Sequence, residues 1–169
     1  MKHDNWEKYG TISRILHGLM AAGFLFMFAT AVAFNIDEKY FSLMSYHKSV
    51  GVLLLILGVI RLIWAIINHK RRPPNLMVAK AGHGLLYVLM LGVPLLGALR
   101  QYANAKGGLD VFGITLIPAA PQKIESLVQL GNQLHGELGF ALFVVVAGHV
   151  AMAVWHQIKG EKIINRMFG

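Results

Sequence analysis

The stretch GNQLHGELGFALFVVVAGHVAMAVWHQ, residues 131–157, decides the fold predicted for this chain. It holds His135 and His149 in an apolar run without a charged side chain between Glu137 and Lys159. At about 100° and about 1.5 Å per residue, the fourteen helical steps between the histidines bring them near one face and roughly 21 Å apart along the axis. We therefore expect one membrane-crossing helix with a histidine toward each end.

The composition supports a membrane protein. Of the 169 residues, 56% are hydrophobic and 14% are charged, and the mean hydropathy is +0.54, which is too apolar for a soluble domain of this size. The absence of cysteine excludes disulfides, thiolate zinc sites and iron–sulfur clusters. Eight histidines remain as the best candidates for metal ligands.

Three further apolar runs have the length of a membrane span. Residues 15–36 carry no charged side chain, residues 49–68 carry only Arg61, and residues 81–99 are uncharged and contain Pro94. Each run can cross a hydrocarbon core of about 30 Å. We predict an all-α integral membrane four-helix bundle, a single domain over residues 1–169 with spans at about 13–34, 47–67, 81–100 and 132–157. The longest connector, residues 101–130, is expected to fold back on the membrane surface.

The basic residues indicate the orientation of the spans. Eleven lie in the terminal segments, the second connector or the adjoining helix ends: Lys2, Lys8, Arg14, Arg61, Lys70, Arg71, Arg72, Lys80, Lys159, Lys162 and Arg166. Five lie on the other side, so the positive-inside rule places both termini in the cytoplasm. Because these charges flank apolar spans, the net charge of +8 reports topology and does not indicate nucleic-acid binding.

The predicted depth of four histidines sorts them into two pairs. His17 and His149 lie toward the cytoplasmic side, whereas His47 and His135 lie toward the outer side. Two pairs of histidines on different helices are what bis-imidazole ligation of two b-type haems requires. The alternative is that these side chains are buried polar contacts between helices, although intramembrane ionisable groups are costly and usually functional.

The residue one turn after each proposed iron ligand is small, which leaves room for a macrocycle. Glycine and alanine are common wherever membrane helices meet, so this pattern supports haem binding without proving it. Tyr87 follows His83 at the same spacing and would crowd a porphyrin, so His83 is predicted to be no iron ligand. The four small residues are Ala21, Gly51, Gly139 and Ala153.

The other histidines have two interpretations. His83 and His156 could both lie near the cytoplasmic haem, as hydrogen-bond partners of a haem propionate or of a quinone carbonyl. Equally, His156 could be an interfacial residue beside Trp155. His3 and His69 lie in polar segments and are expected to be solvated.

The cations at the span edges also have two interpretations, and both stay open. Arg14 and Arg61 could extend to lipid head groups or pair with a haem propionate, whose charge needs compensation near hydrocarbon. The same choice applies on the outer side, where the candidates are Lys48 and Arg100, with Lys106 and Lys123 in the loop.

Together these residues resemble the prokaryotic cytochrome b561 family, which is related to the cytochrome b subunits of nickel–iron hydrogenases and formate dehydrogenases. The resemblance covers nearly the whole chain and rests on the order and spacing of several short motifs. They are SRILHG (13–18), YHKSVG (46–51), VIRLIW (59–64), AKAGHGLLYVLMLGVPLLG (79–97), FGITLIP (112–118), LHGELG (134–139) and AGHVAMAVWH (147–156).

The resemblance implies a multi-pass electron carrier of the bacterial inner membrane with two haem b groups. His17 and His149 would bind one haem, and His47 and His135 the other. The family includes a stand-alone enzyme that takes electrons from superoxide at the outer face and gives them to ubiquinone. We therefore expect a quinone-linked oxidoreductase of the superoxide:ubiquinone type, with ubiquinone as acceptor.

The charge of the outer side limits electrostatic attraction of superoxide. Five cations there face five anions, so no overall positive field is expected. Lys48, Arg100 and Lys106 could still form a local positive surface.

Two other functions are compatible with parts of this pattern. A cytochrome b anchor subunit would relay electrons from a separate dehydrogenase to quinone, although the short connectors favour a stand-alone protein for which such a partner is not required. A haem-free transporter of protons or metal is disfavoured, because Glu137 at a span edge is the one carboxylate near the spans. The expected partners are thus the bilayer, quinone and superoxide.

Overall fold

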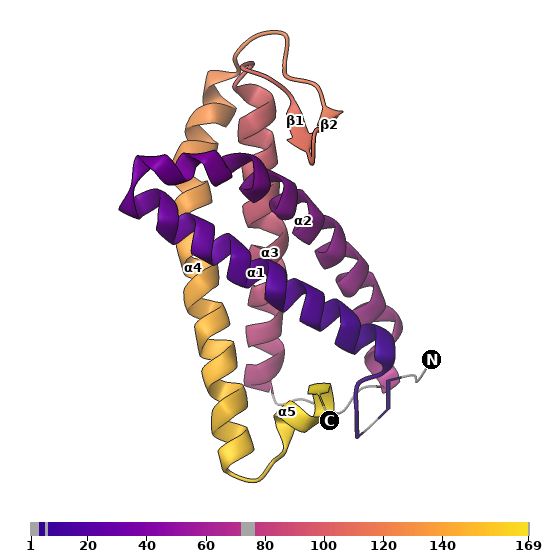
Figure 1. Cartoon of the computed structure of the whole chain (residues 1–169). Helices are drawn as coiled ribbons and strands as arrows, with labels where there is room; N and C mark the ends of the chain where they lie inside the picture. Colours follow the sequence, from indigo (N-terminus) through magenta and orange to yellow (C-terminus); the bar gives the residue numbers. More distant parts are fainter. Residues whose placement is uncertain (1–3, 6, 72–76, 169) are drawn as a thin grey trace.

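The computed structural model describes residues 4–5, 7–71 and 77–168. Four long helices dominate it: α1 (Thr11–Ile36), α2 (Met44–Ile67), α3 (Met77–Ala103) and α4 (Glu125–Ile158) (Figure 1). The smaller elements are η1 (Glu38–Leu43), η2 (His69–Arg71), β1 (Leu109–Val111), β2 (Ile114–Ile117) and α5 (Ile163–Phe168). Several residues used in the sequence analysis lie outside the described ranges: Lys2, His3 and Arg72.

The four long helices confirm the predicted helical bundle of membrane spans. Each is long and apolar enough to cross a bilayer. Only 6–17% of the most apolar window of each helix is buried within the protein, so most of its apolar side chains are at least partly exposed. A surface of this kind needs hydrocarbon as its solvent, and the helical backbone satisfies its own hydrogen bonds there.

Both chain ends lie at the same end of the bundle (Figure 1). Tyr9 N donates a hydrogen bond of 3.0 Å to Arg166 O, which joins the two terminal segments. We call this end, residues 4–5, 7–14 and 159–168, the terminal end. The opposite end, residues 37–46 and 104–124, is called the hairpin end. The cytoplasmic location of the terminal end stays a prediction from charge.

Glycines allow close helix crossings. A Cβ atom at Gly23 of α1 would lie 2.7 Å from Leu54 Cδ2 of α2. A Cβ atom at Gly58 of α2 would lie 2.9 Å from Leu91 Cδ2 of α3. Both distances are below ordinary carbon contact, so a larger residue would have to displace these leucine side chains, and small residues are typical of membrane helix interfaces.

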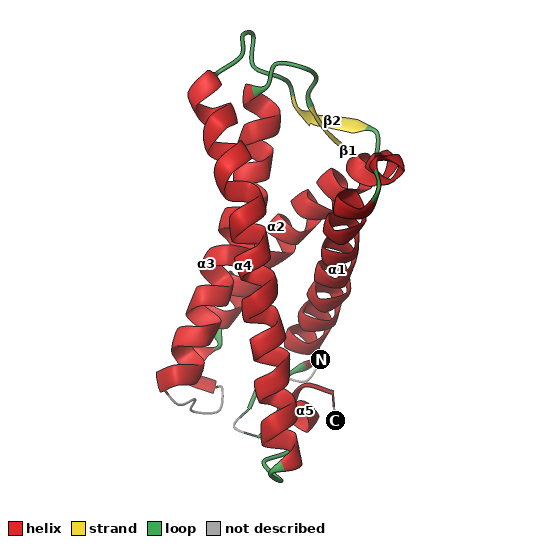
Figure 2. Ribbon diagram, turned by 90° about the vertical axis from the view of Figure 1, so that its left-hand side faces the viewer, coloured by secondary structure: helices red, strands yellow, loops and turns green. Residues whose placement is uncertain are grey.

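Helices α3 and α4 lie side by side over much of their length (Figure 2). Their interface is a cluster of apolar side chains centred on Leu89, Val93 and Leu142. A second cluster joins α1, α2 and α3. It is centred on Met20, Leu54 and Met90. These two clusters hold the backbone that carries the histidines.

The fourth helix begins earlier than the expected span. Residue 132 was the expected start, and His135 was expected to open the helix, but α4 begins at Glu125 and places His135 well inside. The expected start was based on where charged residues stop along the sequence, and this point marks the beginning of the apolar band. Helical hydrogen bonding starts before that band, with Val128 N donating to Ile124 O.

A small antiparallel sheet in the connector after α3 adds to the predicted all-α fold. Strands β1 and β2 pair with Val111 opposite Ile114. Phe112 and Gly113 between them have φ values of 49° and 86°, as a type I′ hairpin turn requires. Phe112 N donates to Ser49 Oγ of α2 at 2.9 Å, so the connector folds back on the bundle.

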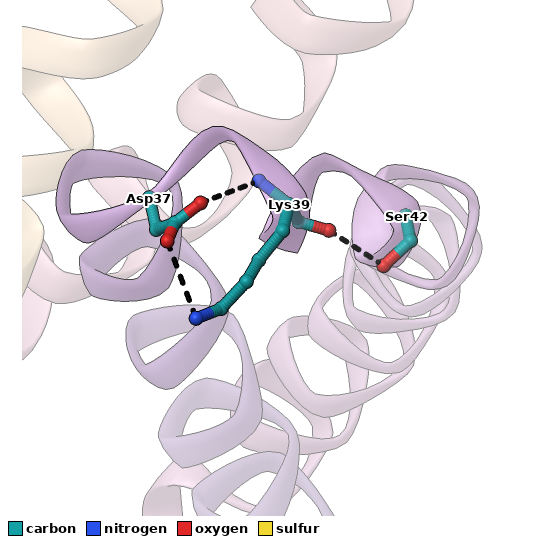
Figure 3. A network of polar contacts seen from close by, with 3 residues as sticks. All are labelled: Asp37, Lys39 and Ser42. Atoms are coloured by element: carbon teal, nitrogen blue, oxygen red, sulfur yellow. Dashed lines mark hydrogen bonds and ion pairs between the residues drawn. The ribbon is translucent and has the colours of Figure 1, made fainter.

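The α1–α2 connector at the hairpin end is closed by local polar contacts (Figure 3). The Asp37 carboxylate accepts a hydrogen bond from Lys39 N at 2.9 Å and lies 3.2 Å from Lys39 Nζ. Ser42 Oγ donates to Lys39 O at 3.0 Å. The positive charge of Lys39 is thus compensated within the turn.

Candidate cofactor sites between the helices

The first histidine pair lies toward the terminal end. His17 of α1 and His149 of α4 have ring centroids 6.4 Å apart, with ring planes at 82°. Both side chains are half-buried. Residues 132 positions apart in the sequence therefore face each other across the bundle.

The second pair lies toward the hairpin end. His47 of α2 and His135 of α4 have ring centroids 6.3 Å apart, with ring planes at 77°. In both pairs, one histidine lies on α4. The other lies on α1 in the first pair and on α2 in the second. The separation of the pairs follows from the fourteen-residue spacing on α4.

The spacing within each pair fits two imidazoles that share one metal ion. A metal–nitrogen bond of about 2.0 Å, added to about 1.1 Å from ring nitrogen to ring centre, gives centroids roughly 6.3 Å apart. Within the described part of the chain, no three histidine, aspartate or glutamate side chains form a metal-binding cluster. The donor set therefore suits a metal whose other ligands come from its own macrocycle, as in bis-histidine haem.

Both histidines at the hairpin end have one ring nitrogen engaged. His47 Nδ1 lies 2.8 Å from Thr30 Oγ1 of α1, and His135 Nδ1 lies 2.9 Å from Val93 O of α3. Because a carbonyl oxygen can only accept, His135 donates from Nδ1 and keeps the lone pair on Nε2. Nε2 is then the nitrogen available to a metal.

Gly97 of α3 provides the space for the His135 ring. A Cβ atom at Gly97 would lie 2.8 Å from His135 Cε1. By contrast, a Cβ atom at Gly51 or Gly139 would meet a neighbouring side chain at 3.5 Å or more, which is ordinary contact. Of the glycines near the histidines, Gly97 is the one on which a ring position depends.

One arginine lies near each histidine pair. Arg61 interacts electrostatically with both His17 and His149, and Arg100 interacts electrostatically with His135. Arg61 Nη1 is buried and has no hydrogen-bond partner among the described residues. A buried guanidinium N–H without a partner is costly, and an anionic oxygen such as that of a propionate would satisfy it.

Comparison with known proteins agrees with this geometry. The sequence profile of the prokaryotic cytochrome b561 family matches residues 8–169. The chain belongs to this family. Cytochrome b561 homolog 2 of Escherichia coli (strain K12) is 30% identical over 174 residues, which cover 96% of this chain and 92% of that protein. Cytochrome b561 homolog 1 of the same organism is 24% identical over 142 residues, covering 78% and 77% of the two chains.

Membership in the cytochrome b561 family confirms the resemblance found from the motifs. It identifies a multi-pass membrane protein of haem b electron transfer. The histidine pairs are the groups in this family member that could hold such cofactors, because each fits the spacing of a shared metal. Their assignment as iron ligands stays a prediction.

His83, expected to be no iron ligand, lies beside the terminal-end pair. Its ring centroid is 5.4 Å from that of His149, closer than two ligands of one metal would be. His83 Nδ1 lies 2.6 Å from Ala79 O, and Tyr87 one turn later packs into the apolar cluster of α1, α2 and α3. The structure thus brings His83 to the site as a neighbour of His149.

The remaining predicted site residues lie at the margin of the terminal end. Arg14 Nε donates to Met167 O of α5 at 2.7 Å, and the Phe168 ring lies 5.9 Å from that of His17. His156 Nδ1 lies 2.9 Å from Glu161 Oε2, so it faces the segment that follows α4. The exposed His69 has Nδ1 3.0 Å from Ile66 O.

Some residues of the site were not found from the sequence. Thr30 could have been noticed, because it carries the one hydroxyl group in the charge-free run of residues 15–36. Gly97, Phe28 and Phe143 gave no such signal, since glycine and phenylalanine are ordinary in membrane helices. The two phenylalanine rings stack between α1 and α4 with centroids 3.7 Å apart.

Proposed function

We propose that the chain binds two haem b groups, one toward each end of the bundle, and passes electrons across the membrane to or from quinone. His17 and His149 bind one haem, and His47 and His135 bind the other. The observation that carries the proposal is the pair of histidine contacts at 6.4 and 6.3 Å, both on α4. A haem bound at each pair supplies reversible one-electron chemistry.

The residues around the pairs have supporting roles. Arg61 and Arg100 compensate propionate charge beside the terminal-end and hairpin-end pairs. Arg14 donates to Met167 O in the last turn of α5, which positions Phe168 against His17. The stacked rings of Phe28 and Phe143 exclude water from the apolar space between the two pairs.

The excess of basic residues at the terminal end supports its placement in the cytoplasm. The hairpin end then faces the outer side. His83, beside His149, is the group we assign to hydrogen bonding with a quinone carbonyl at the terminal end. His156 lies in the same region, where its Nδ1 contacts the Glu161 carboxylate. Ubiquinone is the acceptor proposed for this site.

Superoxide is the electron donor we propose at the hairpin end. Lys39 and Lys123 are compensated by carboxylates, at 3.2 Å from Asp37 and 2.8 Å from Glu125. The other cations of that end have no ion pair among the described residues, and they give a local positive surface that attracts an anion. These cations are Lys106 and, at the edge of that end, Lys48.

The proposed reaction balances in both electrons and protons. Two superoxide anions give one electron each and leave as dioxygen, and ubiquinone takes both electrons with two protons to form ubiquinol. The histidine pairs divide the distance across the membrane into shorter steps, since they lie about 21 Å apart along α4.

Haem content tests the proposal directly. Purified wild-type protein is expected to show two haems per chain and a b-type reduced-minus-oxidised spectrum. His149→Ala should retain about one haem, whereas His69→Ala, a matched change at an exposed histidine, should retain two. A colourless wild-type protein would refute the proposed function.

A second experiment tests the donor. Superoxide added to the purified chain with ubiquinone should reduce the haems, at a rate that falls with ionic strength. Lys48→Gln and Lys106→Gln should slow this reduction, while the double change Lys39→Gln and Asp37→Asn should not, because it removes a compensated pair and leaves the net charge of this end unchanged. Absence of haem reduction by superoxide would exclude superoxide as the electron donor.

An anchor subunit for a separate dehydrogenase is the second candidate. The observation that favours it is the exposed apolar side chains of the hairpin, which include Phe112, Ile114 and Leu116. Such a surface could contact a partner protein. Haem that is present but not reduced by superoxide, together with reduction by a co-purifying dehydrogenase, would support this role.

A further inference from the structure

Thr30 is buried on α1 directly against one of the proposed iron ligands. Its side chain is 2% exposed, and its Oγ1 lies 2.9 Å from Met27 O and 2.8 Å from His47 Nδ1. A hydroxyl group has one proton to donate and lone pairs to accept. The Met27 carbonyl can only accept, so the hydroxyl proton goes to Met27 O and Oγ1 accepts from His47 Nδ1–H.

This arrangement fixes one form of the His47 imidazole. With its proton on Nδ1, the ring keeps a lone pair on Nε2, the form that binds a metal. The reverse arrangement, with Thr30 donating to Nδ1, would put the proton on Nε2 and block that nitrogen. The contact with Met27 O therefore selects the tautomer that the proposed function requires.

The two ends of the bundle differ in this respect. At the hairpin end, Thr30 accepts from His47 and the Val93 carbonyl accepts from His135, so an oxygen on a neighbouring helix holds each ring. Within the described residues, neither His17 nor His149 has a hydrogen bond of this kind. Acceptors on the second ring nitrogen orient metal-bound histidines and raise their basicity.

We infer that Thr30 is a positioning residue for His47, which orients the ring and increases its electron donation to the hairpin-end haem. The inference rests on the proposed function, because it concerns His47 as an iron ligand. More electron donation stabilises the oxidised haem, so the contact lowers the reduction potential at this end. Thr30 itself touches neither iron nor substrate.

The test uses chains that keep a single haem, so that each effect belongs to one end. His149→Ala retains the hairpin-end haem and His47→Ala retains the terminal-end haem. Thr30→Val and Thr30→Ser are then added to each background. Valine has nearly the shape of threonine but cannot accept a hydrogen bond, whereas serine keeps the hydroxyl.

We expect Thr30→Val in the His149→Ala chain to raise the midpoint potential and to speed haem loss to an acceptor protein by about 10-fold or more. Thr30→Ser should leave the midpoint potential and the rate of haem loss close to those of the chain that carries threonine. In the His47→Ala chain, Thr30→Val should change neither. An unchanged potential in the first background, an equal shift in the second, or failure of serine to restore would each overturn the inference.

Failure of the proposed function would look different. Wild-type protein without haem, or a His149→Ala chain that keeps both haems, would refute the ligand assignment before Thr30 is varied. Two haems in wild type and one in His149→Ala, with no response to Thr30→Val, would refute the role of Thr30 alone.

Discussion

Phe28 of α1 and Phe143 of α4 stack face to face, with ring centroids 3.7 Å apart and planes inclined by 6°. Phe143 is eight residues after His135 and six before His149, so the stack lies between the two histidine pairs. Helices α1 and α4 therefore meet through these rings at the middle of the bundle. Each histidine pair has its own surroundings on one side of the stack.

Removing one ring of this stack should destabilise the bundle. Phe143→Ala loses the aromatic pair, worth about 1 kcal/mol beyond the apolar area that it buries. We expect a lower thermal unfolding midpoint in detergent, measured by circular dichroism. Phe140→Ala is the control, because Phe140 is on the same helix but 66% exposed, and it should unfold close to wild type. Equal midpoints for the two variants would contradict the role of the stack.

Gly97→Ala should disturb the hairpin-end haem selectively. The added Cβ would lie 2.8 Å from His135 Cε1, so the ring must move from its hydrogen bond with Val93 O. Haem quantitation should fall from two toward one per chain. Gly92→Ala on the same helix meets no atom within 4 Å and should keep two. Full haem content in Gly97→Ala would show that the ring can adjust.

Substitution of His17 and of His83 should give opposite results in a haem assay. His17 is 6.4 Å from His149 and fits a shared metal, whereas His83 at 5.4 Å is too close. We expect His17→Ala to lose about one haem and His83→Ala to keep two, with slower reoxidation by ubiquinone in the second variant. A haem lost from His83→Ala and kept in His17→Ala would reverse the ligand assignment.

Arg61 should raise the potential of the terminal-end haem. A cation stabilises the reduced haem, which carries one less positive charge, so Arg61→Gln should lower the midpoint potential by on the order of tens of millivolts. The readout is a potentiometric titration of the His47→Ala chain, which retains this haem. Arg71→Gln changes an exposed arginine at the same end and should leave the potential near its original value. Equal shifts would indicate general surface charge.

Much of the arrangement was predictable from the sequence because a bilayer restricts it strongly. Four apolar runs had to become four helices, since only a helix satisfies its own backbone hydrogen bonds in hydrocarbon. Depth then followed from position within each run, and it predicted the contacts of His17 with His149 and of His47 with His135 that the structure contains. The motifs predicted the family, which the comparisons confirm.

Other features were not predictable because they depend on contacts between segments far apart in the chain. The hairpin of β1 and β2 is fixed by a hydrogen bond between Phe112 and Ser49, and α4 begins before its apolar band. The contact of Arg14 Nε with Met167 O has the same origin, because α5 lies against the start of α1. The residues around Arg14 do not indicate that a segment from the other end of the chain packs against them.

For the proposed cofactor sites, the sequence by itself determined which helix each histidine occupies and at which depth, because helical rise converts residue number into height. Only the tertiary structure decided the surroundings of each ring. It placed Thr30 against His47, Gly97 against His135 and His83 against His149. The physical reason is that helix rotation and lateral packing follow from side-chain contacts between helices, and one helix cannot specify these alone.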